Sequence, residues 1–281
     1  MTIVFLNGDF LPLDQAKVSV MDRGFLFADS VYEVIPVHQG RIFCCDQHLE
    51  RLQTSLDAIR LPLVIDKPYW HTLLAELMAR NGGTQSDQSI YLQITRGPQP
   101  TRSHVSQGTV KPTIFAQCTP LHTPTLSQLR QGATAITYAD IRWKYCYIKS
   151  TALIANVLLA ELAKEVGAHE TILIRDGYAI EGATSNVFIV KDNLIKTPPL
   201  TQEILAGVTR NVIVQLLKQH QINYIEAPIL EAELLTADEV WITSSSREIL
   251  PIIKINDKPV GNGNAGAMWE KVIKIFTQAS V

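Results

Sequence analysis

A lysine among aromatic residues is the most chemically suggestive feature of this 281-residue sequence. In "RWKYCYIKSTALIANVLLAEL", which spans residues 142–162, Lys149 follows Tyr145, Tyr147 and Ile148 and precedes an apolar helical pattern. The positive end of a helix dipole repels an ammonium group at a helix start, and apolar neighbours also favour the uncharged amine. A neutral amine is the form that adds to a carbonyl carbon to make a Schiff base. Lys149 is therefore a candidate for covalent catalysis, although most lysines are surface charges.

A carboxylate stands at the end of an expected strand, where Glu181 occurs in "YAIEGATSNVF". A glycine and several small hydroxyl residues follow it. The ordinary interpretation is a turn carboxylate. The functional interpretation is an acid that pairs with a protonated ring nitrogen, because a pyridine-type cofactor withdraws electrons best when that nitrogen carries a proton.

Three further segments carry groups that could bind a phosphate. In "LAGVTRNVIVQL", Gly207, Val208 and Thr209 open an expected helix, whose free N–H groups and dipole favour an anion. The motif "ITSSSREI", residues 242–249, offers hydroxyl groups after a strand. Arg51 lies in "HLERL" on the helix face away from the leucines, where a solvated arginine is the default and a phosphate clamp is the alternative.

The elements that would position these residues are mixed. Hairpins are expected around Asn7-Gly8 and Gln39-Gly40. A helix follows Asp46, a second covers about residues 68–80, and strands follow in "SIYLQITRG" and "TVKPTIFAQC". The first of these helices repeats apolar residues at spacings of three and four: Leu49, Leu52, Leu56 and Ile59. Helices among antiparallel hairpins indicate an α+β fold.

The second half is expected to form a domain of its own. We expect an N-terminal α+β domain over residues 1–118, a linker over 119–132 and a C-terminal domain over 133–281. The C-terminal domain should contain a helix from about residue 150 to 166, a hairpin at Asp176-Gly177, and one strand over "EVWITSSSREILPIIKI". Helices are also expected from Thr209, in "ILEAELLTA" and in "AMWEKVIKIFTQA". The apolar face of the helix over 150–166 should be Leu153, Val157, Leu158 and Leu162.

Composition narrows the class of protein. The sequence is 46% hydrophobic and has a net charge of −2, so nothing in it indicates a nucleic-acid or membrane partner. We expect neither a secretory leader nor a transmembrane span, and no cysteine pair has the spacing of a zinc site. The four cysteines are expected to be reduced thiols in a cytoplasmic protein: Cys44, Cys45, Cys118 and Cys146. No metal site is predicted.

Taken together, the candidate segments resemble a known family. They are "DRGFLFADSVYEV", "HLERL", "DIRWKYCYIKS", "EGATSNVF" and "GVTR", and they extend over most of the chain. In this combination the chain resembles the fold-type IV pyridoxal-phosphate enzymes, and among them the D-amino acid aminotransferases. The resemblance implies a smaller N-terminal domain, a larger C-terminal domain with a mixed sheet, and pyridoxal 5′-phosphate as the cofactor.

The resemblance also assigns roles to individual residues. Lys149 would bind the cofactor as a Schiff base and move protons, while Glu181 would hold the pyridine nitrogen. Leu205 would support the cofactor ring. The phosphate would be held by Arg51, Val208, Thr209 and Ser245.

Substrate recognition is expected at a carboxylate trap. By resemblance, Tyr32 in "SVYEV" and the pair Arg102 and His104 in "TRGPQPTRSHVS" would bind the α-carboxylate of a D-amino acid such as D-alanine or of a 2-oxo acid such as 2-oxoglutarate. This pair stands one residue farther from Arg96-Gly97 than the family pattern has it. The family also implies a homodimer in which this loop serves the neighbouring subunit.

Three alternatives remain open at this point. Two belong to the same fold type: a branched-chain aminotransferase acting on L-amino acids, and an aminodeoxychorismate lyase, which eliminates pyruvate. The spacing of Arg102 and His104, together with Tyr32, favours the D-amino acid enzyme. The third is a non-catalytic binding protein, which the joint presence of Lys149 and Glu181 disfavours.

Overall fold

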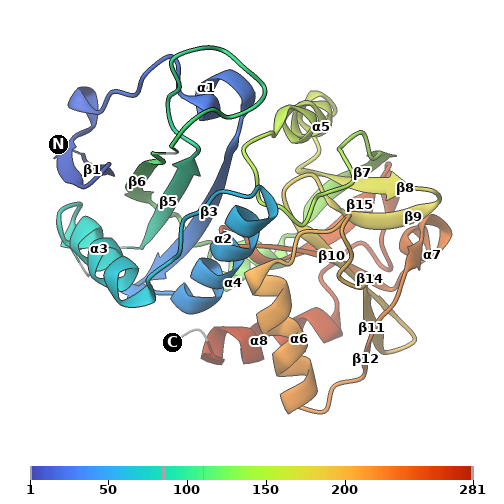
Figure 1. Cartoon of the computed structure of the whole chain (residues 1–281). Coiled ribbons are helices and arrows are strands. Elements are labelled where there is room, and N and C mark those ends of the chain that lie inside the picture. Colours follow the sequence, from blue (N-terminus) through green and yellow to red (C-terminus); the bar gives the residue numbers. More distant parts are fainter. Residues whose placement is uncertain (1, 84–86, 110, 280–281) are drawn as a thin grey trace. The chain divides into compact units, whose positions relative to one another are not determined.

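Two separate sheets organise the chain, which a computed structural model describes over residues 2–83, 87–109 and 111–279 (Figure 1). One compact unit consists of Met1–His122 and Ile148–Leu153, and the other of Thr123–Tyr147 and Ile154–Val281. The chain therefore leaves the second unit for six residues, and Lys149 lies in that excursion. The segment expected as a linker, residues 119–132, contains the end of a strand and a short helix.

The sheet of the first unit has six antiparallel strands in the order β2-β1-β6-β5-β3-β4. Both predicted hairpins are confirmed. Asn7 and Gly8 have φ of 55° and 110°, and Gln39 and Gly40 have φ of 49° and 78°, as tight two-residue turns require. The strands are β1 (Ile3–Leu6), β2 (Asp9–Pro12), β3 (Ser30–His38), β4 (Arg41–Ile42), β5 (Gln88–Thr95) and β6 (Thr113–Pro120). The predicted strand "TVKPTIFAQC" includes residue 110, which lies outside the described residues.

Helices cover this sheet. Helix α2 (Cys45–Ala58) packs on β3, and α3 (Lys67–Ala79) packs on β1 and β6. The predicted leucines of α2 are completely buried: Leu49, Leu52 and Leu56. Asp46, the expected cap, lies in the first turn of α2, because Cys44 occupies the capping position. Among its described residues the unit also has two short helices, η1 (Leu13–Gln15) and α1 (Arg23–Phe27).

The sheet of the second unit is mixed. Its order is β12-β11-β10-β14-β15-β7-β8-β9-β13, with β16 beside β15. The pairs β7/β8, β7/β15 and β11/β12 are parallel, and the others are antiparallel. The strands are β7 (Ala133–Ala139), β8 (Glu170–Arg175), β9 (Tyr178–Gly182), β10 (Asn186–Lys191), β11 (Leu194–Thr197), β12 (Tyr224–Glu226), β13 (Ile229–Leu230), β14 (Glu239–Ser244), β15 (Glu248–Ile255) and β16 (Lys258–Pro259).

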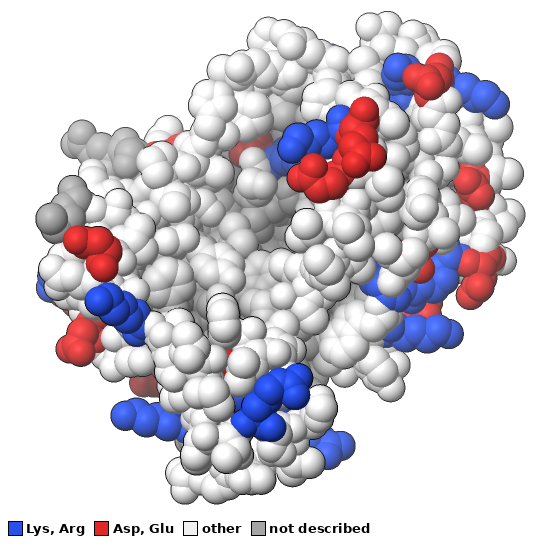
Figure 2. Space-filling model, turned by 90° about the horizontal axis from the view of Figure 1, so that it is seen from above, with Lys and Arg blue, Asp and Glu red and all other residues white. Residues whose placement is uncertain are grey.

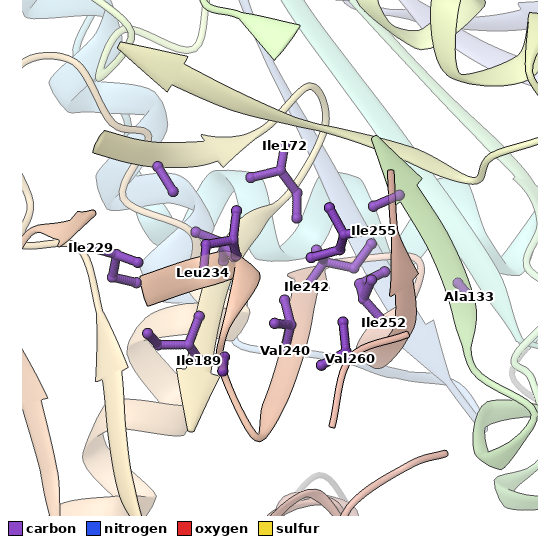
Figure 3. Close-up of a cluster of buried hydrophobic side chains, with 14 residues drawn as sticks. Ala133, Ile172, Ile189, Ile229, Leu234, Val240, Ile242, Ile252, Ile255 and Val260 are labelled. Carbon is purple, nitrogen blue, oxygen red and sulfur yellow. The ribbon is translucent and has the colours of Figure 1, made fainter. Parts of the chain in front are cut away.

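An aliphatic cluster fills one face of this sheet (Figure 3). Val187 and Ile189 on β10, and Val240 and Ile242 on β14, alternate with period two toward the same core. The helices described in this unit are α4 (Leu126–Arg130), α5 (Ile154–Glu165), α6 (Val208–Gln219), α7 (Glu231–Leu235) and α8 (Ala267–Ala279). Helices α6 and α8 pack against each other and against β14. Helix α6 begins at Val208, within one residue of the predicted start at Thr209.

The start of α5 differs from the prediction. We expected the helix to begin at residue 150, but it begins at Ile154. The preceding residues pair with β3 instead, since Ser150 bridges to Val31 and the Thr151 N–H donates to the Ser30 carbonyl at 3.1 Å. Lys149 therefore lies outside the helix, and the dipole argument for its neutral amine is wrong.

The predicted apolar face of α5 is also wrong in part. The residues of α5 that are buried are Leu159 and Ala163, whereas Val157 and Leu158 are each 52% exposed. Leu162 of the predicted face does pack against the buried Leu159 and Leu173.

The distribution of charged side chains on the surface is consistent with the net charge of −2. On the face shown in Figure 2, acidic and basic side chains stand in small groups separated by wide uncharged areas. No helix among the described residues is both long and apolar enough to cross a bilayer. The described residues also hold no group of three or more histidines, cysteines or acids arranged for a metal ion.

Candidate active site

Lys149 is fixed through its backbone by β3 and α2. Its carbonyl accepts the Tyr32 N–H at 3.0 Å, and its own N–H donates to the Ser55 hydroxyl at 3.1 Å. The Nζ atom lies 4.1 Å from the centroid of the Tyr32 ring. The first unit thus brings together the predicted Schiff-base lysine and the predicted substrate tyrosine.

Three side chains of the same unit form a largely buried group: Glu33, His48 and Arg51. Arg51 donates from Nε and Nη2 to the two carboxylate oxygens of Glu33, both at 2.7 Å, and Nδ1 of His48 lies 2.7 Å from the same carboxylate. Burial alone would raise the pKa of Glu33, but the Arg51 guanidinium and the His48 imidazole outweigh it and hold that pKa at about 2. Burial is the main reason that the pKa of His48 is lowered.

This trio corrects the default interpretation of Arg51 as a solvated arginine. Its side chain is 10% exposed, and Glu33 fixes the plane of its guanidinium. The contacts from Nε and Nη2 to Glu33 make Arg51 an oriented cation.

The loop that carries Arg102 and His104 exposes both side chains. The Arg102 guanidinium carbon lies 4.9 Å from the Phe27 ring centroid, and the His104 ring lies 5.3 Å from it. Among the described residues, Arg102 forms no ion pair. The aromatic neighbour of the Tyr32 ring is Tyr91, at 5.7 Å, so the three predicted substrate residues fall into two groups within the unit.

In the second unit, Glu181 is 3% exposed and accepts three hydrogen bonds. Nη1 of Arg142 donates to Oε1 at 2.5 Å, while the Asn186 amide and the Leu205 N–H donate to Oε2 at 3.1 and 3.2 Å. Burial raises the pKa of Glu181 to about 7, although the Arg142 cation opposes it. Glu181 is thus a carboxyl group whose charge changes near neutral pH, and a cationic partner stabilises its ionised form.

Arg142 belongs to a longer chain of alternating charges. Asp140, whose side chain is fully buried, lies 2.9 Å from Nη2 of Arg142 and 2.8 Å from Nη2 of Arg175. Arg175 in turn lies 2.9 Å from Glu203, which is partly exposed. Sequence reasoning missed Arg142 and Asn186, because both reach Glu181 from other strands and loops.

The start of α6 is tied to the Glu181 network. Gly207 caps the helix without a side chain, and a Cβ at this position would lie 2.0 Å from Oδ1 of Asn186. The Asn186 amide also donates to the Leu205 carbonyl at 2.9 Å. Val208 and Thr209, which open the helix, are buried. The second unit therefore joins the predicted ring support and the predicted phosphate helix to the predicted ring-nitrogen acid.

Ser245 lies in a turn between β14 and β15, so the single strand expected there is two strands. The turn is held at Arg247, whose Nη1 lies 3.1 Å from Glu170. The buried Glu170 carboxylate also accepts the hydroxyls of Thr184 and Ser185 at 3.0 and 2.9 Å. One buried acid thus links the small-residue turn after Glu181 to the turn that carries Ser245.

Comparison with known proteins decides the family. The model of the amino-transferase class IV family matches residues 30–255. The chain belongs to this family. The resemblance to fold-type IV enzymes and the α+β fold are both confirmed.

Relatives of this class IV aminotransferase extend over nearly its whole length. A D-alanine aminotransferase of Bacillus licheniformis is 39% identical over 96% of this chain and 94% of its own. A D-alanine aminotransferase of Staphylococcus epidermidis is 39% identical over 98% and 97%. Among solved structures, the Escherichia coli branched-chain amino acid aminotransferase has a TM-score of 0.90 at 25% identity, covering 99% of this chain and 94% of its own.

A further solved structure is the branched-chain amino acid aminotransferase of Thermobaculum terrenum in its PLP-form. It has a TM-score of 0.87 at 21% identity and covers 99% of this chain and 93% of its own, which is a likeness of fold. The cofactor of the class IV family is pyridoxal 5′-phosphate. The described residues fit it chemically, because they offer a lysine amine, a buried acid poised near neutrality and an oriented arginine.

Proposed function

We propose that this aminotransferase transfers the amino group of D-amino acids, such as D-alanine, to 2-oxo acids, such as 2-oxoglutarate. The observation that carries this proposal is the similarity to D-alanine aminotransferases, at 39% identity over almost the full length of both chains. The exposed Arg102 and His104, which can bind a carboxylate, support it further.

Lys149 and Glu181 are the proposed reacting residues. When bound, pyridoxal phosphate supplies a carbonyl carbon and an electron-withdrawing ring. The Nζ amine of Lys149 would hold the cofactor covalently and, once freed by the amine of the substrate, would move the proton that leaves the substrate α-carbon. The Glu181 carboxylate would hold the ring nitrogen in its protonated form. Arg142 supports this role because its cation favours the ionised form of Glu181.

The remaining assignments concern binding. Arg51, the Ser245 hydroxyl and the backbone N–H groups of Val208 and Thr209 hold the phosphate, because a helix start and a guanidinium both favour an anion. The Leu205 side chain supports the ring.

The substrate carboxylate is bound by Tyr32, Arg102 and His104. The hydroxyl of Tyr32 donates one hydrogen bond. The guanidinium of Arg102 can bind a carboxylate with two parallel hydrogen bonds, and the imidazole of His104 adds a third donor group.

The active enzyme is proposed to be a cytoplasmic homodimer whose loop with Arg102 and His104 serves the partner subunit. Exposed apolar residues at helical spacing on α5 support self-association, since Ile154 is 72% exposed and Val157 and Leu158 are 52% exposed. Four free thiols support a reducing compartment. Light scattering with size-exclusion chromatography measures the mass, and a monomer at enzymatic concentrations would contradict this part of the proposal.

The preference of the enzyme for one amino-group donor over another tests the proposed transamination of D-amino acids. The holoenzyme is incubated with 2-oxoglutarate and either D-alanine or L-leucine, and the appearance of the new 2-oxo acid is followed. Turnover with D-alanine and little with L-leucine is expected. A strict preference for L-leucine would favour the second candidate, a branched-chain aminotransferase, which the structural likeness to such enzymes makes a specific alternative.

A further inference from the structure

One aromatic ring in the first unit is surrounded by three nitrogen-rich side chains. Phe27, the last residue of α1, has the guanidinium carbons of Arg23 and Arg102 each 4.9 Å from its ring centroid. The imidazole of His104 lies 5.3 Å from the same centroid, tilted by 41°. The face of an aromatic ring attracts cations, so Phe27 is a shared platform for the loop after β5, which passes beside α1 in Figure 1.

The tip of this loop is also held through its backbone. Arg23 is 6% exposed and donates from Nη1 to the Ser103 carbonyl at 2.5 Å and from Nη2 to the His104 carbonyl at 2.9 Å. Its Nε donates to Asp29 at 2.8 Å, and Arg96 donates to the same carboxylate. Asp29 thus fixes the plane of Arg23, and Arg23 fixes the backbone on which His104 stands.

The base of the loop is attached to the same region of the chain. The Arg23 N–H donates to the Gly97 carbonyl at 3.0 Å, and Asp22 bridges to Pro98. Gly97 has φ of +84°, and a Cβ there would lie 1.9 Å from the Lys111 carbonyl oxygen, so the two ends of the loop approach closely. The α1 segment therefore contacts the loop at both its base and its tip.

We propose that Phe27 and Arg23 are positioning residues for substrate binding, which hold Arg102 and His104 in the orientation that captures a carboxylate. This inference rests on the proposed function and goes beyond it, because neither residue would touch the substrate. A loop that is ordered before binding loses less conformational freedom when the carboxylate arrives. The ring carries the Arg102 guanidinium without neutralising it, whereas an acidic partner would compete with the substrate.

Phe27→Leu tests the platform, since it keeps an apolar side chain and removes the ring. We expect KM for D-alanine and for 2-oxoglutarate to rise about tenfold. The value of kcat and the absorbance of the bound cofactor should not change, and amide hydrogen exchange over residues 100–107 should become faster. Phe27→Tyr, which restores a ring face, should return KM to near the wild-type value.

A matched control lies in the same unit. The Arg80 guanidinium carbon lies 4.6 Å from the Phe10 ring centroid, so Phe10→Leu removes a contact of the same kind away from the loop. We expect this variant to leave KM unchanged. An unchanged KM in Phe27→Leu, or a kcat loss that Phe27→Tyr does not restore, would overturn the proposal.

Arg23→Lys gives a second, independent measurement if Phe27→Leu folds poorly. A lysine keeps the charge beside Asp29, but its single nitrogen cannot reproduce the planar fork that contacts Asp29 and both carbonyls, so the same rise in KM and faster exchange are expected. The two proposals fail differently. Wild-type protein without turnover of D-amino acids would refute the proposed function, whereas unchanged exchange over residues 100–107 in both variants would refute the positioning role alone.

Discussion

Nη1 of Arg142 lies 2.5 Å from Oε1 of Glu181, and both side chains are buried. The relationship sets the charge of the acid, because burial raises the pKa of Glu181 to about 7 while the Arg142 cation opposes that rise. In the proposed function Glu181 holds the ring nitrogen and has to be ionised at the working pH, and Arg142 favours that ionised form.

Arg142→Met should therefore raise the pKa of Glu181 further. Since the protonated acid cannot stabilise a charged ring nitrogen, we expect kcat at pH 7 to fall by about tenfold or more, with partial recovery at higher pH. The measurement is a pH profile of kcat. Arg130→Met, at an exposed ion pair with Glu270, is the control. A profile that does not move toward alkaline pH would contradict the role of Arg142.

The free energy of unfolding should depend on pH through the carboxyl group of Glu33. Its pKa is about 2 in the fold and 4.5 in an unfolded chain, so the unfolded chain binds more protons between these values. The stabilisation by Glu33 is therefore complete above pH 4.5 and is lost as the pH falls toward 2.

Urea unfolding of the apoprotein measures this effect. The wild-type midpoint should fall steeply below pH 4.5, and Glu33→Gln should flatten that dependence. At pH 7 the variant should be less stable by about 3 kcal/mol, because it leaves Arg51 without its buried counter-charge. An equally steep acid dependence in the variant would assign the effect to other carboxylates.

The ion pair between Glu170 and Arg247 should affect the binding of the cofactor's phosphate group and not the binding of its ring. Arg247→Gln frees the turn that carries Ser245, so we expect weaker binding of pyridoxal phosphate, by less than about tenfold because this arginine is 38% exposed. Binding of pyridoxal, which has no phosphate, should not change. Titration of the apoprotein with both compounds gives the two affinities. Equal losses for both compounds would indicate a general disturbance of the unit.

Gly207→Ala should disturb the contact between α6 and Asn186. The new methyl group would lie 2.0 Å from Oδ1 of Asn186, whose amide serves both Glu181 and Leu205. We expect a loss of about 1–3 kcal/mol in the free energy of unfolding and weaker cofactor binding. Adding Asn186→Gly should restore stability without restoring activity, and recovery of both would mean that the amide is dispensable.

Local chemistry explains which elements the sequence predicted well. Asn7-Gly8 and Asp176-Gly177 adopt positive φ, and the hairpins stand where these pairs indicated. Helix α8 coincides with its apolar pattern. In each case the signal lies within a short stretch of sequence.

Long-range pairing explains the failures. The first turn expected for α5 is instead held by Ser30 and Val31 of β3, more than a hundred residues earlier in the chain. Arg142 and Glu181 meet across 39 residues, so this counter-charge of the predicted ring-nitrogen acid was not visible in the motif that contains Glu181. Candidate groups could be selected from the sequence, but their counter-charges required the fold.

The role of Lys149 can be tested by trapping its covalent bond with the cofactor. Borohydride reduction of the holoenzyme, proteolysis and mass spectrometry identify the lysine that carries the phosphopyridoxyl group. The same peptide region contains Lys144, an exposed lysine that serves as an internal control. We expect the label on Lys149, and no label after prior exchange with excess D-alanine. A label on Lys144 or on another lysine would contradict it.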